Sequence, residues 1–158
     1  MNWQIIRYAH VLLWKAEALI ELGDGAGLEE ARNIINRIRR RAMQSEYVKN
    51  FNDPTKDAAN YLIGEYPTAG WTQAYARQAL RFESRLECAM EGERFFDLVR
   101  WGIAAETMNA YLDVERTKRV YYSTASFTAG RDEYLPIPLP QYNFSNGLYV
   151  QNPGYGDF

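Results

Sequence analysis

The sequence predicts a mostly α protein: tetratricopeptide-like αα-hairpins in a short α-solenoid, followed by an irregular proline-rich C-terminal tail. Apolar residues recur with the 3.6-residue spacing of an amphipathic helix in three segments. The strict alternation that marks a half-buried strand is nearly absent. A length of 158 residues suits a single domain over 1–158. The prolines of the last segment forbid a continuous helix there, namely Pro136, Pro138, Pro140 and Pro153.

Residues 1–43 are expected to form the first helix pair. A helix over 5–22 has a broad apolar face and ends at a glycine turn, and a second helix runs over 28–43. The small residues Ala16 and Ala31 stand where the two helices would touch. Phosphate binding and a solvated face that complements the helix dipole are alternatives for the arginines of the second helix, and we interpret them as a solvated face. These arginines are Arg32, Arg37, Arg39, Arg40 and Arg41.

The rest of the chain divides into a loop, a second helix pair and a tail. Glycine and proline punctuate the loop at 44–71, in which 58–63 is expected to form one short helical turn. Thr72 is the expected N-cap of a third helix that ends near Met90, and the second helix pair covers 72–112. The final segment, 113–158, is expected to hold a hairpin or extended loop and then an extended strap over the helices.

An acidic stripe in the third helix raises the question of catalysis. Glu83, Glu87 and Glu91 are each four residues apart and share one helix face. Retaining glycosidases hold two carboxyl groups about 5–5.5 Å apart, which neighbours on such a stripe can match. The side chains of one stripe run side by side, however, whereas a glycosidase flanks the scissile bond from two directions. We therefore expect no enzymatic activity.

Three motifs carry a resemblance to a known family. They are RYAHVLLWKAEAL from Arg7, ESRLECAMEGERFFDLVRWG from Glu83, and LPIPLPQYNFSNGLYVQNPGY from Leu135. In this order they resemble the C-terminal region of the SusD/RagB family, the surface glycan-binding lipoproteins of the Bacteroidetes outer membrane. The tail departs from the family pattern by two residues, Leu139 and Pro140, inserted before Gln141.

The resemblance implies a function, a partner and a location. It implies a non-catalytic glycan- or nutrient-binding protein, exposed at the surface of the outer membrane, that hands oligosaccharide to a SusC-like TonB-dependent transporter. It also implies that one segment is a structural ion-pair network, in which bidentate arginines hold the last helix pair together. The residues of this network are Glu83, Arg85, Glu87, Glu91, Arg94, Asp97 and Arg100.

The resemblance covers only the last part of such a protein. No signal peptide is visible at the start of the chain, and the single cysteine, Cys88, lies within a helix, where it is no lipid anchor. We therefore expect either a missing N-terminal half or self-association through the first helix. Either one would cover an apolar face around Ile5, Ile6, Leu12 and Leu13.

A ligand site is expected in the long loop and at the start of the third helix. Carbohydrate sites offer an exposed aromatic face flanked by polar groups, and Tyr66, Trp71 and Tyr75 are the candidates here. The alternative for these rings is core or rim packing. The alternative hypothesis for the function of the whole chain is a helical-repeat adaptor, which binds a protein partner and no sugar.

Composition and motifs argue against several other partners. The formal net charge of −2 gives no electrostatic reason to bind nucleic acid. His10 is the only histidine, and neither a calcium-binding loop nor a phosphate-binding glycine loop occurs in the sequence. No cofactor and no metal site are therefore expected.

Overall fold

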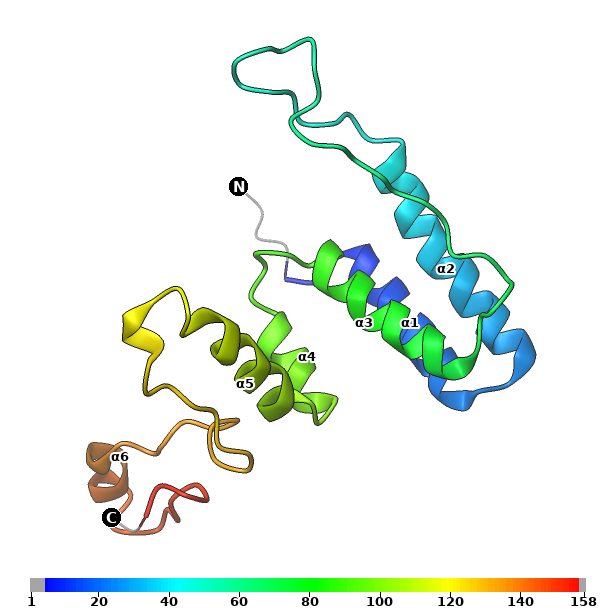
Figure 1. Cartoon of the computed structure of the whole chain (residues 1–158). Helices are drawn as coiled ribbons and strands as arrows, with labels where there is room; N and C mark the ends of the chain where they lie inside the picture. Colours follow the sequence, from blue (N-terminus) through cyan, green and yellow to red (C-terminus); the bar gives the residue numbers. More distant parts are fainter. Residues whose placement is uncertain (1–4, 157–158) are drawn as a thin grey trace. The chain divides into compact units, whose positions relative to one another are not determined.

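The computed structural model describes residues 5–156, which form two compact units with the boundary between Gly92 and Glu93. The end of the predicted tail, at 157–158, lies outside the described residues. Within 5–156 the regular structure is helical, apart from one antiparallel bridge between Lys49 and Asp57 (Figure 1). The mostly α fold class is thus confirmed.

The first unit is built on a helix pair, α1 (Tyr8–Leu22) and α2 (Gly25–Met43). Gly23 ends α1 with φ +76°, the left-handed conformation that glycine adopts without steric cost. The Asp24 side chain then caps α2 by accepting a hydrogen bond of 2.8 Å from the backbone N–H of Gly27. Ala16 and Ala31 are fully buried in the core that α1 and α2 share, as their small size predicted.

The third helix, α3 (Gln73–Glu87), packs on both α1 and α2 (Figure 1). The Thr72 hydroxyl accepts from the backbone N–H of Tyr75, so the predicted N-cap is confirmed. The helix ends at Glu87, earlier than expected, because the chain turns into the left-handed region at Met90, with φ +68°. The core of this unit comprises Leu13, Ala16, Ile20, Ala31, Ile34, Ile35, Ile38, Ala76, Leu80 and Cys88.

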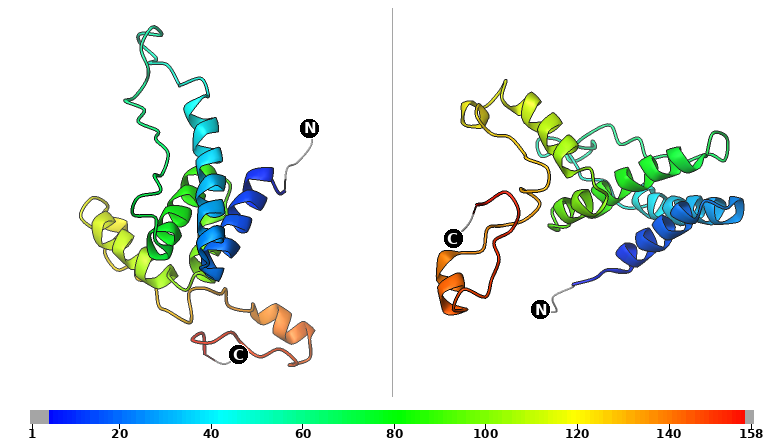
Figure 2. Two further views of the ribbon diagram at one scale, coloured as in Figure 1. Left: turned by 90° about the vertical axis from the view of Figure 1, so that its right-hand side faces the viewer. Right: turned by 90° about the horizontal axis from the view of Figure 1, so that it is seen from below.

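Between α2 and α3 the chain makes a long excursion and returns beside α2 (Figures 1 and 2). The short helical turn expected at 58–63 is wrong, because residues 58–59 form a bend and 60–63 have no regular secondary structure. Hydrogen bonds from Ala58 N–H to the Val48 carbonyl and from Asn50 N–H to the Lys56 carbonyl close a small antiparallel ladder at its start.

The second unit contains α4 (Arg94–Arg100), α5 (Ala104–Glu115), the 3₁₀ turn η1 (Val120–Tyr122) and α6 (Leu139–Phe144). Helices α4 and α5 pack together. The continuous strap expected for the tail is interrupted by α6, which corrects that prediction. Pro140 lies in the first turn of α6, where the N–H that proline lacks has no partner within the helix anyway.

The two motifs of the tail bind each other. The Gln151 amide accepts from the Ile137 N–H at 2.7 Å and donates to the Ile137 carbonyl at 3.0 Å. Asn152 donates to the carbonyl of Leu135 at 2.6 Å. Side-chain amides therefore replace a strand ladder in holding the segment after Leu135 against the segment that ends at Tyr155.

None of the helices within residues 5–156 combines the length and the apolar character that a membrane crossing requires.

Candidate functional site

Three aromatic rings predicted to form a site lie together in the first unit. Tyr66 is on the returning loop segment, Trp71 ends that segment, and Tyr75 is in the first turn of α3. The ring centroids are 5.5 Å apart for Tyr66 and Trp71, 5.8 Å for Trp71 and Tyr75, and 6.0 Å for Tyr66 and Tyr75. Both contacts of Tyr75 are edge-to-face, the geometry that aromatic quadrupoles favour.

Two of these rings are held by the core. Tyr66 and Trp71 are partly buried and pack against it, and Trp71 Nε1 donates to the Leu28 carbonyl at 2.8 Å. The Tyr66 hydroxyl donates to Glu83 Oε1 at 3.0 Å. Burial, reinforced by the charge of Glu83, holds the pKa of Tyr66 above its ordinary value. Tyr75, at 42% exposure, is the ring of the three with the most surface open to a ligand.

Polar side chains of α2 hold the returning segment in place. Asn36, which is 1% exposed, donates to the Tyr66 carbonyl at 2.9 Å and accepts from the Tyr66 N–H at 2.8 Å. Arg32 donates to the same carbonyl. The guanidinium carbon of Arg39 lies 4.7 Å from the centroid of the Tyr66 ring. A buried amide that satisfies both backbone groups of one residue fixes that residue in place.

The arginine face of α2 is therefore not simply a solvated face, and that interpretation is corrected. Arg39 binds Glu83 and the Gly64 carbonyl. Arg32 binds Glu29, Arg40 binds Glu65, and Arg41 binds Glu87. Sequence reasoning missed these partners because most of them lie 25 to 46 positions away along the chain.

The acidic stripe of α3 is held by cations of α2 and of the N-cap of α1. Glu83, with its side chain 5% exposed, pairs with Arg39. Glu87 accepts from Arg7 at 2.9 Å and from Arg41 at 2.5 Å. Each carboxylate is nearly buried and has a guanidinium partner, which satisfies the requirement for charge inside a protein.

Arg7 is a central residue that the sequence analysis did not single out. Its guanidinium contacts both oxygens of Glu91, at 3.0 and 2.7 Å, and also binds Glu87. The hydrogen bonds of Arg7 hold the pKa of Glu91 below its ordinary value, and the two carboxylates raise the pKa of Arg7. Arg7 stands 80 positions or more from these partners, so no local spacing indicates it.

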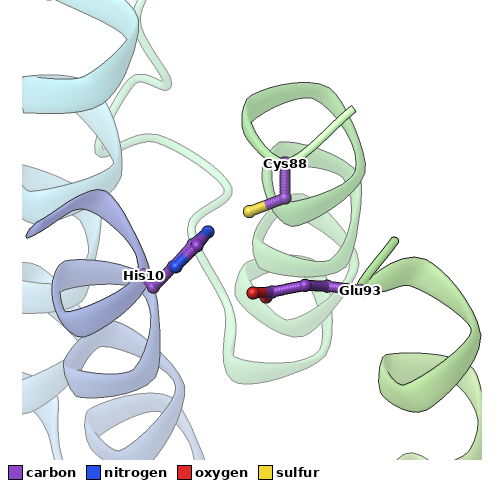
Figure 3. A group of neighbouring side chains, drawn as sticks. All are labelled: His10, Cys88 and Glu93. Carbon is purple, nitrogen blue, oxygen red and sulfur yellow. The ribbon is translucent and has the colours of Figure 1, made fainter. Parts of the chain in front are cut away.

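His10 is a structural side chain in this arrangement. Its Nδ1 accepts from the backbone N–H of Arg7 at 3.1 Å, which caps α1, and its Nε2 lies 3.2 Å from Glu91 Oε2. Since Nδ1 accepts, Nε2 is the nitrogen that carries the proton toward Glu91. Figure 3 shows the His10 ring facing the thiol of Cys88, which is buried in the core at the end of α3.

The remaining residues of the expected network lie elsewhere. Arg85 is exposed on α3. In the second unit Asp97 pairs with Arg100 at 2.9 Å, one turn apart on α4. Arg94 and Arg100 place their guanidinium carbons 5.8 and 4.9 Å from the centroid of the Trp101 ring, so this tryptophan lies against cations.

These features define a class of helical protein. In it, a helix pair holds a long loop by hydrogen bonds, buried ion pairs attach a third helix, and side-chain amides hold the segments of the tail together. The model of the SusD family matches residues 1–155, and the chain belongs to that family.

Two relatives illustrate the similarity. The chain is 32% identical over 155 residues to SusD-like protein P2 of Formosa agariphila, an alignment that covers 98% of this chain and 26% of that protein. It is also similar to the crystal structure of a SusD homolog from Bacteroides thetaiotaomicron, with a TM-score of 0.68 and 32% identity. That match covers 97% of this chain and 27% of the other. The chain thus spans about a quarter of the length of these relatives.

Proposed function

We propose that this chain functions in the non-catalytic binding of glycans or other nutrients at the bacterial cell surface. In this role it takes up oligosaccharide at the outer membrane and passes it to a SusC-like TonB-dependent transporter. The observation that carries the proposal is the family match over residues 1–155, supported by 32% identity to a solved SusD homolog. Both the SusC-like transporter as partner and the oligosaccharide as ligand are proposed for this chain.

The geometry supports binding rather than catalysis. Glu83 and Glu87 are held against arginines, and Glu91 is held by Arg7 and His10. A general acid needs a proton to give and a general base needs a free lone pair near the substrate. Carboxylates that neutralise guanidinium groups inside a helix interface instead stabilise the fold.

We propose that the sugar contact of this region is made by the exposed ring of Tyr75, while Trp71 and Tyr66 position it. A pyranose presents C–H groups that pack on an aromatic face, and its hydroxyls need polar partners nearby. Because one exposed ring and a few hydrogen bonds offer little after the cost of immobilisation, the affinity of this contact should be modest.

Isothermal titration calorimetry against a panel of oligosaccharides tests the proposal. We expect wild-type protein to bind members of the panel and Tyr75→Ala to bind them more weakly. Phe51→Ala is the matched control, because Phe51 is a 97% exposed aromatic residue in the loop between α2 and α3. Binding of a protein partner with no binding of any glycan would instead favour the helical-repeat adaptor.

A test of the transporter partner is separate. We expect a tagged copy of the protein, expressed in a Bacteroidetes host, to co-purify with a TonB-dependent transporter from detergent-solubilised outer membranes. Recovery of the protein without any transporter, under conditions that preserve a known transporter pair, would contradict this part of the proposal.

A further inference from the structure

A second feature of the first unit has the character of a ligand site. A cavity of about 350 Å³ lies between the C-terminal half of α2, the returning loop segment and the second half of α3. This volume is within the range of small-molecule sites, which begins at about 300 Å³. Its lining consists of Ile38, Arg39, Ala42, Leu62, Ile63, Phe82, Glu83, Leu86 and Glu87.

The lining includes apolar side chains that are open to solvent. Phe82 on α3 is 51% exposed, Leu86 is similarly exposed, and Leu62 on the loop is 83% exposed. Exposed apolar groups that converge on one hollow gain free energy when a ligand removes them from water. Phe82 adds an aromatic face, against which C–H groups pack favourably.

The lining also includes a nearly buried polar group. The Glu83 side chain is 5% exposed, and its Oε1 accepts from Arg39 and from the Tyr66 hydroxyl. Among the described residues, no hydrogen-bond donor reaches its other oxygen, Oε2. Oε2 is not among the buried side-chain atoms that lack a partner, so it keeps some contact with solvent and can accept a hydrogen bond from a ligand hydroxyl.

We propose that this cavity is a subsite for one neutral pyranose ring, seated on Phe82 with a hydroxyl donating to Glu83 Oε2. The site rests on the proposed glycan-binding function and is distinct from the Tyr75 contact. A pyranose suits it because the ring combines a C–H face for Phe82 with hydroxyl donors at its edge.

The charges around the cavity specify a neutral sugar. Glu83 is paired with Arg39, and Glu87 is paired with Arg7 and Arg41. Neither a sulfate nor an ammonium group would find an uncompensated counter-charge in this arrangement, yet each would lose its hydration on entry. Uncharged oligosaccharides should therefore bind better than sulfated or uronate-containing ones of the same length.

Two variants test the subsite. Phe82→Ala removes the aromatic face, and Ala42→Phe fills the cavity from α2. We expect each to weaken the binding of a neutral oligosaccharide about tenfold or more in calorimetric titration, the size of effect that goes with one buried aromatic side chain. Phe51→Ala should leave the affinity within about twofold, because Phe51 does not line the cavity.

A second readout locates the ligand without relying on a mutation. In methyl NMR spectra of the wild type, a neutral oligosaccharide should shift the signals of Leu62, Ile63 and Leu86, whereas Leu22, which is exposed outside the cavity, should not move. Far-UV circular dichroism of each variant establishes that it is folded.

The outcomes separate the two proposals. If the wild type binds sugar but Phe82→Ala and Ala42→Phe bind it equally well, the subsite is wrong and the glycan-binding function stands. Equal binding of sulfated and neutral sugars at these methyl groups would overturn the neutral specificity. If the wild type binds no member of the panel, the proposed function fails, and the subsite fails with it.

Discussion

The two units of the chain use charge in different ways. In the first unit several ion pairs join residues far apart in sequence, as with Arg39 and Glu83 or Arg7 and Glu91, beside local pairs such as Arg32 with Glu29. In the second unit the described pairs join close neighbours, such as Arg116 with Asp113 and Arg131 with Asp132. A long-range pair holds separate elements together, whereas a local pair is partly available to the unfolded chain as well.

Burial differs in the same direction. The carboxylates Glu83 and Glu87 are almost closed to solvent, while Asp113 is largely exposed. Exposed ion pairs contribute little, but the loss of one partner from a buried pair leaves an uncompensated charge. We therefore expect the loss of a buried long-range pair of the first unit to cost more stability than the loss of an exposed local pair such as Arg116 with Asp113.

The largest effect is expected from breaking the buried pair. Arg39→Ala leaves Glu83 with only the Tyr66 hydroxyl, and we expect it to lower the free energy of unfolding by about 3–5 kcal/mol. The control in the second unit, Asp113→Ala, removes the exposed partner of Arg116 and should cost no more than about 0.5 kcal/mol. Urea denaturation followed by circular dichroism measures both. Similar values for the two variants would break the comparison.

The next prediction compares the same amide contact in the two units. Asn36 binds both backbone groups of Tyr66, and Asn109 binds both backbone groups of Phe127 at 2.9 Å. Asn36 is buried and Asn109 only half-buried, so Asn36→Ala leaves its backbone partners with less access to water. We expect a loss of about 1–3 kcal/mol for Asn36→Ala and a smaller loss for Asn109→Ala.

Hydrogen exchange sharpens this comparison. The Tyr66 amide should exchange much faster in Asn36→Ala than in the wild type, while the Phe127 amide is unchanged. If the Tyr66 amide remains protected in the variant, the returning loop segment is held by other contacts, and Asn36 is not its anchor.

The third prediction concerns acid. Hydrogen bonds from Arg7 hold the pKa of Glu91 below its ordinary value of 4.5, so the contact stabilises the fold above that pH. This stability is lost as the pH falls from about 4.5 through the lowered pKa of the folded state. Glu91→Gln should therefore make stability less dependent on pH below about 4.5.

The second unit again provides the control. Arg131 lowers the pKa of Asp132, with the same sign, but the two residues are adjacent in sequence. Because the unfolded chain keeps them close, Asp132→Asn should change the acid dependence less than Glu91→Gln. Thermal unfolding between pH 2.5 and pH 6 measures both variants, and a larger change for Asp132→Asn would reverse the order that we expect.

Much of the fold follows from local pattern. The periodicity of the apolar residues placed α1, α2 and α3, and the residues Gly23 and Thr72 marked a helix end and a helix start that the structure confirms. These features depend on neighbours within a few positions, which the sequence displays directly. The apolar face expected around Ile5 is only partly right, because Leu13 packs in the core, whereas Ile5 and Ile6 are exposed.

The contacts of the candidate site are harder to predict from the sequence, because they join residues that are far apart along the chain. The sequence indicated the stripe of glutamates on α3, but not that Arg7 and Arg39 hold it. Likewise, no local pattern shows that Asn36 fixes Tyr66. The helix α6 was missed for another reason: prolines exclude a helix interior, but Pro140 occupies the first turn.

The smallest expected effect concerns backbone conformation. Met90 and Asn146 are the described non-glycine residues with positive φ, at +68° and +54°, one in each unit. Methionine pays a steric cost in this region, whereas asparagine tolerates it. The Met90 side chain is fully exposed, so its removal loses no packing. We expect Met90→Gly to stabilise the protein by up to about 1 kcal/mol and Asn146→Gly to change stability by less. The melting temperatures of the two variants provide the measurement. If Met90→Gly lowers the melting temperature, the extra flexibility that glycine gives the unfolded chain outweighs the steric strain that it removes at this turn.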